Sequence, residues 1–337
     1  MASCIAPRKD FPGTDVFASR DGISIVRSDL GCFLRAPNLH SGQGLEVWPL
    51  HPACRGGDHY VGDPASSSVY ILRGGTFCRA PELGAEPAPS SLPLHPSCQD
   101  GDHYSSNGSH FHVLFLARGV VLSVADLATG ADAKEAPLEP ASRHGLYYYT
   151  ADSTHLAFLS MDGDHGLRGH LVSRAGSEET FPIHPDVAAF LPGGLALSHG
   201  AAFGAWECVK IISNELDVPL PGTHEITRKV GFAQKALPWK VPAGGSLEVG
   251  ALTTALLQSQ FSLPSAYGGL GLRTEQEEWE EAAEEGEPLR VILQPRQKLY
   301  WWQYCLGLGT DPLLFCRSLK VTRSPVPPAN VPLPTAD

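Results

Sequence analysis

PLHPACRGGDHY at residues 49–60 returns as PLHPSCQDGDHY at residues 93–104, an offset of 44 residues. The same offset places Arg35-Ala36-Pro37 on Arg79-Ala80-Pro81. A third, more divergent copy keeps Pro137-Leu138, Gly145 and Tyr148, and a fourth ends in Pro182-Ile183-His184-Pro185. The copies begin near Thr14, Asp58, Asp102 and Leu146, and the last ends near Ala189. Because each repeated sequence unit corresponds to one structural unit, we expect four such units in the first half of the chain.

Each copy holds short apolar segments between clusters of Gly, Pro, Asn and Ser, which is typical of β-strands. One such segment occupies the equivalent positions 23–26, 69–72, 113–116 and 156–159. Four strands in about 44 residues is the size of a propeller blade. We therefore expect a four-bladed β-propeller-like domain over residues 14–192, after an N-terminal segment of residues 1–13. The alternatives are other closed β arrays, including a trefoil, which would need three copies.

The third copy distinguishes residues that are kept in all three copies from residues that are present only in the first two. It retains Gly145 and Tyr148 but loses the Asp, His and Cys of the first two copies. Repeated Gly and Tyr are expected to build the same tight turn and core contact in each unit. The residues lost in the third copy are therefore the better candidates for function.

The candidate ligand-binding residues lie in the first two copies. They are Asp58, His59, Tyr60, Asp102, His103 and Tyr104, with Arg35 and Arg79 nearby. Asp can accept hydrogen bonds from sugar hydroxyls while an aromatic ring stacks on the sugar, and one weak site per copy would act through avidity. Cys54, Cys98 and the neighbouring His are metal-ligand types, but their H-x2-C-x3-DH spacing matches no metal motif, so no metal or cofactor is expected. Buried structural roles for these Cys and His are the main alternative.

Composition and charge exclude several classes. The chain of 337 residues has 35 Gly and 29 Pro, which argues against a helical bundle, while 42% apolar and 18% charged residues exclude simple disorder. The net charge of −11, with eight Glu between residues 274 and 287, gives no electrostatic reason to bind nucleic acid. Because no G-x-S-x-G, P-loop or H-E-x-x-H signature is present, we expect a protein that is not an enzyme.

The ends and the hydropathy of the chain bear on its location. The first residues lack the apolar region of a secretory signal, and no apolar run approaches the 18 residues of a membrane-spanning helix. Eight Cys without a signal peptide indicate free thiols in a reducing compartment. A cytoplasmic protein, or one secreted by a non-classical route, is expected.

The period stops after Leu191-Pro192-Gly193-Gly194, and residues 193–323 are expected to form a second β domain. Its predicted strands are residues 206–213, 224–232, 260–263, 289–294, 299–306 and 313–322. Residues 246–263 alternate at both ends but have helical spacing in the middle, so both interpretations stay open. Residues 324–337 hold five Pro and are expected to be an extended tail.

The order of features in this half resembles the aerolysin-like pore-forming family. An Asn step follows a long strand at Ile211-Ile212-Ser213-Asn214, an alternating strand follows at His224 to Val230, and Gln294-Pro295 opens the late strands. The resemblance covers roughly 130 residues and implies an elongated β domain whose central segment refolds into a membrane hairpin. That segment would be residues 246–263, with the candidate insertion residues Leu247, Val249, Ala251, Leu256, Phe261 and Leu263.

These observations lead to one expected function and one alternative. We expect the repeat domain to recognise a glycan or lipid on a membrane surface, coupled to homo-oligomerisation of the second domain and to a β-barrel pore. A transmembrane strand would need about 9 to 11 alternating residues, and several chains would have to close the barrel. The alternative is a soluble intracellular binding or scaffold protein without membrane activity.

Overall fold

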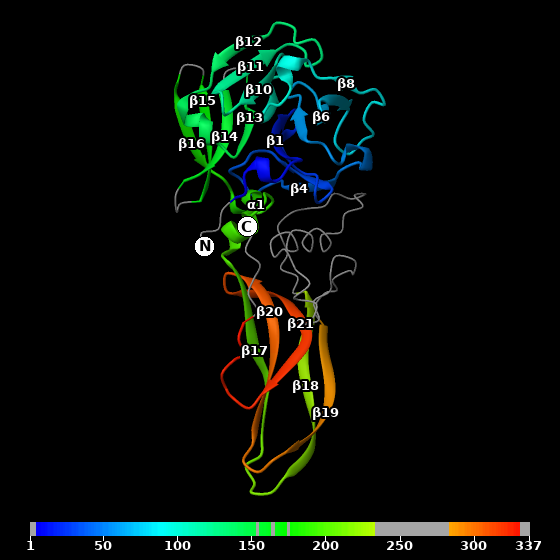
Figure 1. Ribbon diagram of the computed structural model, residues 1–337, viewed down its shortest axis with the longest axis vertical. Helices are drawn as coiled ribbons and strands as arrows, with labels where there is room; N and C mark the ends of the chain where they lie inside the picture. Colours follow the sequence, from blue (N-terminus) through cyan, green and yellow to red (C-terminus); the bar gives the residue numbers. More distant parts are fainter. Residues whose placement is uncertain (1–4, 153–154, 163–165, 174–175, 233–282, 331–337) are drawn as a thin grey trace. The chain divides into compact units, whose positions relative to one another are not determined.

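The computed structural model describes residues 5–152, 155–162, 166–173, 176–232 and 283–330. These residues form two compact units, the first up to residue 198 and the second from residue 199, and each is described by itself. Regular structure in the described part is almost entirely β, as the composition predicts (Figure 1).

The first unit consists of four antiparallel sheets, each of four strands in chain order. Sheet 1 contains β1 (Thr14–Ser19), β2 (Gly22–Arg27), β3 (Cys32–Ala36) and β4 (Glu46–Pro49). Sheet 2 contains β5 (His59–Gly62), β6 (Val69–Arg73), β7 (Thr76–Ala80) and β8 (Leu92–Pro93). Sheet 3 contains β9 (His103–Ser106), β10 (Phe111–Phe115), β11 (Val120–Val124) and β12 (Lys134–Pro137). Sheet 4 contains β13 (Tyr147–Thr150), β14 (His155–Met161), β15 (Leu167–Ser173) and β16 (Glu178–Pro182). Each sequence copy therefore supplies one four-stranded sheet, as the period predicts.

Short helices connect or follow the sheets. They are η1 (Arg8–Asp10), η2 (Pro52–Cys54), η3 (Pro96–Cys98), η4 (Pro140–His144), α1 (Pro185–Ala188) and α2 (Gly194–His199). No helix in the described residues is long and apolar enough to cross a membrane.

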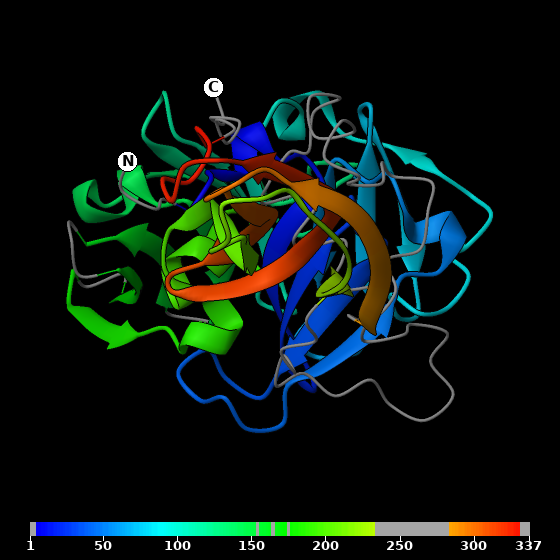
Figure 2. The ribbon, with the colours of Figure 1, turned by 90° about the horizontal axis from the view of Figure 1, so that it is seen from below.

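The first strands of the four sheets meet at a common centre. Strand β1 packs against β5 and β13, and β9 packs against the same two strands. In Figure 2 the colours of this unit run in sequence around the centre, from blue through cyan to green. The first strands therefore contact one another in the order β1, β5, β9 and β13, and β13 also contacts β1.

One backbone hydrogen bond recurs between neighbouring copies. The amide nitrogens of His51 and His95 donate to the carbonyls of Leu83 and Leu127, over 2.9 and 2.8 Å. The fourth copy makes the same bond to the first, from His184 N to the Leu39 carbonyl over 2.9 Å. Because the period brings these donors and acceptors to equivalent places, the bond joins the end of the repeat region to its beginning.

The repeated Gly and Tyr build one turn, as expected from the third copy. Gly57 N donates to the Tyr60 hydroxyl over 3.0 Å, and that hydroxyl donates to the Cys54 carbonyl over 2.7 Å. Tyr104 and Tyr148 make the same two bonds in copies 2 and 3. A Cβ on the equivalent glycines would overlap the tyrosine ring, which explains why Gly and Tyr recur together.

The PLHP step has a structural explanation too. Proline occupies the first turn of η2, η3 and α1, where its missing N–H costs no hydrogen bond. The preceding His51, His95 and His184 each accept an N–H from that turn through Nδ1. In copy 3 Glu139 takes this place without a side-chain bond. The histidines of the motif thus act as helix caps.

The second unit is a five-stranded sheet with the order β17-β20-β21-β18-β19. Its strands are β17 (Ala202–Ser213), β18 (Leu220–Phe232), β19 (Ala283–Leu293), β20 (Lys298–Leu308) and β21 (Asp311–Thr322). The predicted strands 206–213, 224–232, 289–294, 299–306 and 313–322 each fall on one of these strands, but the observed strands begin one to six residues earlier. The predicted strand 260–263 lies outside the described residues.

The sheet of the second unit separates along its length. Within the described residues, strand β18 pairs with β21 at Gly231–Phe315 and Phe232–Leu314. The antiparallel pair of β18 and β19 diverges from the other three strands, and both parts contribute to a buried core of Ile212, Ile226, Leu293, Leu299 and Trp301. From the Pro-rich segment 324–330, the Ala329 carbonyl accepts a hydrogen bond from Trp206 Nε1 over 3.1 Å.

The loop between β17 and β18 is held by the side chain of Asn214. The buried Asn214 amide donates to the carbonyls of Val218, Leu293 and Gln294, and its oxygen accepts Leu216 N over 3.0 Å. These bonds hold the Asn step in place, so that the apolar side chains of Leu216 and Val218 stay 51% and 58% exposed.

Candidate functional site

The structure assigns the repeated aspartates to turns. Asp58 Oδ2 accepts the Gly74 N–H over 2.7 Å, and Asp102 Oδ2 accepts the Leu116 N–H over 2.6 Å. Both side chains are exposed at the surface of the first unit. Each carboxylate therefore supports a hairpin turn through its Oδ2 atom, and its Oδ1 atom takes no part in these two bonds.

The repeated histidines lie in the buried centre. His59 and His103 share one repeat position with Asp15 and Tyr147, each on the first strand of its sheet. Burial, followed by Arg8 and then His103, lowers the pKa of His59 to about 2. Burial and then Arg8 hold the pKa of His103 well below its ordinary value. Both imidazoles are consequently neutral.

The remaining predicted residues also have partners within the fold. Tyr60 and Tyr104 are 1% and 6% exposed, so their rings are covered by protein. Arg35 lies over the ring of Trp48, 5.4 Å from its centroid. Arg79 lies 5.8 Å from the Tyr70 centroid, with an Nη2 bond of 2.9 Å to the Ser68 hydroxyl. The predicted residues are thus dispersed over turns, centre and sheet faces.

A groove of about 510 Å³ lies elsewhere in this unit, between sheets 3 and 4. Its floor is formed by apolar side chains of both sheets, namely Val121, Ala136, Leu138, Leu156 and Val172. Three histidines, two acids and one lysine surround this floor, namely His110, His112, His155, Asp152, Glu139 and Lys134. A mostly apolar cavity with a few convergent polar groups is the usual form of a small-ligand site.

The polar wall of the groove on sheet 3 is one row across three strands. His112 pairs with Ser123, and Ser123 pairs with Lys134. His112 Nδ1 and the Ser123 hydroxyl are 2.7 Å apart. Because side chains on one sheet face repeat every second residue, the next row on this face holds Val121 and Ala136. The wall therefore changes from polar to apolar within one step along the strands.

The opposite wall belongs to sheet 4. Asp152 holds His155, whose Nδ1 is 2.8 Å from Asp152 Oδ2. Thr150 stands beside them on β13, and its hydroxyl is 2.7 Å from that of Ser105. The polar groups of this wall are thus bonded in pairs above the apolar floor.

The groove opens where the repeat changes. Arg35, Arg79 and Ser123 are one period apart, on the third strand of sheets 1, 2 and 3. In sheets 1 and 2 the long guanidinium side chain covers an aromatic ring of its own sheet. Serine reaches only as far as His112, so the rim between sheets 3 and 4 has no guanidinium, whereas Arg79 lines a shallow cavity of about 680 Å³ on sheet 2. This change is visible in the repeat alignment, but sequence reasoning sought function in residues that recur.

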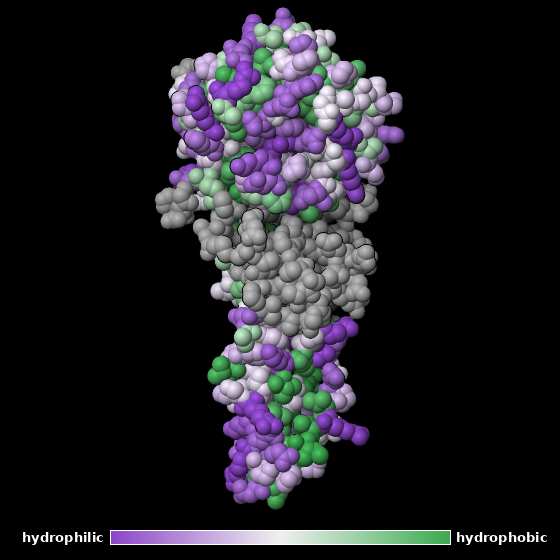
Figure 3. Space-filling view, viewed as in Figure 1, coloured by the Kyte–Doolittle hydropathy of each residue, from purple (hydrophilic) through white to green (hydrophobic). Residues whose placement is uncertain are grey.

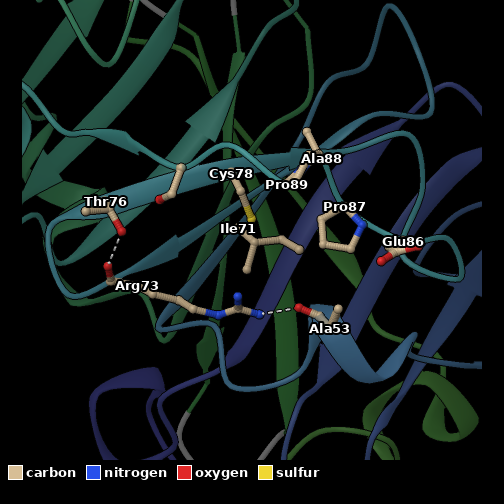
Figure 4. A pocket seen from close by; sticks show the side chains of 10 residues that line it. Ala53, Ile71, Arg73, Thr76, Cys78, Glu86, Pro87, Ala88 and Pro89 are labelled. Atoms are coloured by element: carbon tan, nitrogen blue, oxygen red, sulfur yellow. Dashed lines mark hydrogen bonds between the residues drawn. The ribbon is translucent and has the colours of Figure 1, made fainter.

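A second pocket, of about 250 Å³, lies on sheet 2 beneath residues 86–91 (Figure 4). Arg73 extends along it and donates through Nη2 to the Ala53 carbonyl over 2.7 Å and to the Arg55 carbonyl over 2.7 Å. Thr76 Oγ1 donates to the Arg73 carbonyl over 2.9 Å. Because its cation is already bonded to the backbone, this pocket offers less to a ligand than the groove does.

Two further questions concern metals and membrane insertion. Within the described ranges, no three His, Cys, Asp or Glu side chains are grouped so that they could hold a metal ion. The candidate insertion residues Leu247, Val249, Ala251, Leu256, Phe261 and Leu263 lie outside the described residues.

Comparison with known proteins leaves the groove as the main guide to function. No protein-family model matches the chain, and no curated protein matches it either.

Proposed function

We propose that the protein recognises an amphipathic, lipid-type ligand without changing it chemically, and that the groove between sheets 3 and 4 is the binding site. The observation that carries this proposal is the apolar floor with its polar rim, opened by Ser123 where the two earlier copies have arginine. The other proposed ligand class is a glycan, bound through the exposed Asp58 and Asp102 of the sequence repeat.

The proposal includes an architecture. The first unit is a four-bladed β-propeller whose blades are sheets 1 to 4. The succession of first strands around one centre and the His184–Leu39 bond from the last copy to the first support this closure. The site then lies between two blades.

The second unit is proposed to be an aerolysin-like domain through which copies assemble at a membrane. Its support is the long five-stranded sheet with the Asn214 step, and the apolar side chains that it exposes. Leu216, Val218 and Ile292 are 51%, 58% and 62% exposed, and Figure 3 shows apolar side chains on the visible face of this unit. Exposed apolar patches often mark interaction sites. A scaffold protein without membrane activity is the alternative.

Ser123→Arg tests the groove. We expect the wild-type protein to bind the neutral apolar dye Nile red, and the variant to lose most of the fluorescence of the bound dye, because a guanidinium beside His112 would occupy the rim of the groove. Ser123→Ala is the matched control, since it removes the hydroxyl but leaves the rim open. Equal dye binding by wild type and Ser123→Arg, both folded by circular dichroism, would show that the groove takes no ligand.

Dye-loaded phosphatidylcholine vesicles test the assembly step. We expect leakage and an SDS-resistant oligomer at micromolar protein concentration. Leu256→Arg, in the predicted insertion segment, should abolish leakage and leave Nile red binding intact, because an Arg at the bilayer midplane of a transmembrane strand costs about 2–4 kcal/mol. Absence of both leakage and oligomer would favour the scaffold alternative.

A further inference from the structure

We infer that the ligand of the groove is an amphiphile with a single acid group, such as a medium-chain monocarboxylate. This inference rests on the proposed function and names the ligand class of the same site. It follows from the order of charged, polar and apolar side chains along the groove.

The end of the groove at the start of β12 favours an anion. Lys134 stands there, beside the His112–Ser123 pair, and makes no ion pair within the part of the chain that the structure describes. The equivalent place in sheet 1 holds the acid Glu46, which pairs across the strands with Arg35. In sheet 3 the cation stands at the outer strand and a neutral serine beside it. The row is therefore left with a positive charge for a ligand to neutralise.

The acid on the facing wall does not cancel this charge. The Asp152 carboxylate is 2.8 Å from His155 Nδ1 and accepts the His155 N–H of the backbone over 2.9 Å. Its oxygens are thus directed to its own loop. The Ser123 hydroxyl and the His112 ring, 2.7 Å apart, supply hydrogen-bonding groups beside Lys134. A carboxylate at this end would be recognised by one cation and by hydrogen-bond donors.

The apolar floor continues from this polar row. Val121 and Ala136 form the next row on the same face of sheet 3, and Leu156 and Val172 face them from sheet 4. A ligand with its acid group at Lys134 would lay its apolar part on this floor. The acid group of the ligand would then contact the polar row with Lys134, and its apolar chain would contact the apolar floor.

The far end of the groove limits the ligand to one acid group. Glu139 lies there, just beyond Leu138, which is four residues past Lys134. The three strand steps from Lys134 to Pro137 extend about 10 Å, and Leu138 and Glu139 follow the end of the strand, so a chain of roughly ten carbons would reach towards Glu139. A second carboxylate at that distance would meet Glu139, and like charges in contact repel. The groove therefore favours a monocarboxylate over a dicarboxylate of equal length.

Isothermal titration of the full-length protein with decanoate, 1-decanol and sebacate tests this assignment at pH 7. We expect decanoate to bind at least about tenfold more tightly than the neutral alcohol and the ten-carbon dicarboxylate. Lys134→Gln should weaken decanoate about tenfold and leave decanol unchanged, while Ser123→Arg should abolish both. Lys9→Gln is the matched control, because Lys9 is an exposed lysine of the same unit, outside the groove.

The outcomes separate this inference from the proposed function. Equal binding of decanoate and decanol, or no effect of Lys134→Gln, would overturn the acid assignment, while Nile red binding lost in Ser123→Arg would still support the groove. If Ser123→Arg still bound decanoate, decanol and Nile red as the wild type does, both the acid assignment and the proposed function of the groove would be overturned. Co-sedimentation with oleate-containing phosphatidylcholine vesicles, abolished by Lys134→Gln, would assign an acid at a membrane surface. Binding of free decanoate without co-sedimentation would assign a free acid, and both results support the inference.

Discussion

Replacing Arg8 by methionine is expected to lower the free energy of unfolding of the first unit by about 3–5 kcal/mol. Arg8 Nε is 2.7 Å from Asp15 Oδ1, and the two side chains are only 8% and 7% exposed. Burial raises the pKa of Asp15, and the Arg8 charge is the largest influence that lowers it. Without Arg8 the carboxyl would keep the Tyr60 N–H, 2.9 Å from Oδ2, but would lose its counter-ion.

Arg8 also joins parts of the unit that are far apart in sequence. Its Nη2 donates to the Asp58 carbonyl, and its backbone N–H donates to the Leu146 carbonyl. Two residues earlier, the Ala6 carbonyl accepts the Tyr147 hydroxyl over 2.9 Å and the Ala6 N–H donates to the Pro192 carbonyl over 3.0 Å. The N-terminal segment thus bonds to sheets 1, 2 and 4. Its loss would loosen the centre at which the sheets meet.

Hydrogen exchange of peptides from β1, β5 and β13, with increasing urea, measures the effect within the first unit. Lys9→Met is the matched control, because Lys9 is the exposed neighbour of Arg8. The double variant Arg8→Met/Asp15→Leu should recover most of the loss, since it leaves no buried charge without a partner. A loss below about 1 kcal/mol for Arg8→Met would show that the pair contributes little.

The repeat was sufficient to predict the sheets and their turns. Its Gly, Tyr and Pro recur because each sheet closes the same turn, as the bonds of Tyr60 and Tyr104 demonstrate. The binding residues predicted from the same repeat do not lie together in one site. Residues recur in each copy because every sheet needs them for its own turns and packing. The groove arises instead from a position that does not recur, Ser123. No alignment within one chain indicates that a missing side chain leaves a cavity.

Two other features lay beyond sequence reasoning because they depend on long-range packing. Arg8 stands outside the repeats, and its partner is identified only when the first strands converge. Five strands of the second unit were predicted, but their order, β17-β20-β21-β18-β19, is non-local. Strand patterns report which face is buried and do not report which strands pair.

The second large effect is expected from pH. The stability of the first unit should fall as the pH falls below about 6.5, by about 1.4 kcal/mol per pH unit for each of His59 and His103. The pKa of His59 is lowered from 6.5 to about 2 in the folded state, and that of His103 is also well below 6.5. The unfolded chain therefore takes up protons that the folded chain does not. Stability is complete above 6.5 and is lost progressively towards the folded-state pKa.

His59→Phe/His103→Phe tests this expectation. The His59 ring lies 4.5 Å from Tyr104 and the His103 ring 4.5 Å from Tyr148, so phenylalanine keeps a ring at both contacts without a titrating group. Between pH 6 and 4.5, the slope of unfolding free energy against pH should decrease by about 2–3 kcal/mol per pH unit relative to wild type. His144→Gln, at an exposed histidine of η4, is the matched control.

The comparison of slopes isolates these two histidines from the other groups of the buried centre. Asp15 acts in the opposite sense, because burial raises its pKa and its protonation favours the folded state as the pH falls. Arg8 remains charged throughout this range, and Tyr147, whose pKa burial raises, remains neutral. The surface carboxylates contribute alike to wild type and variant, so they cancel in the difference, whereas Asp15 Oδ1 lies 3.9 Å from His59 Nδ1 and its titration is read together with that of His59. An unchanged slope in the double variant would mean that the imidazoles accept protons in the folded state, and the centre would then have to open to water at acidic pH.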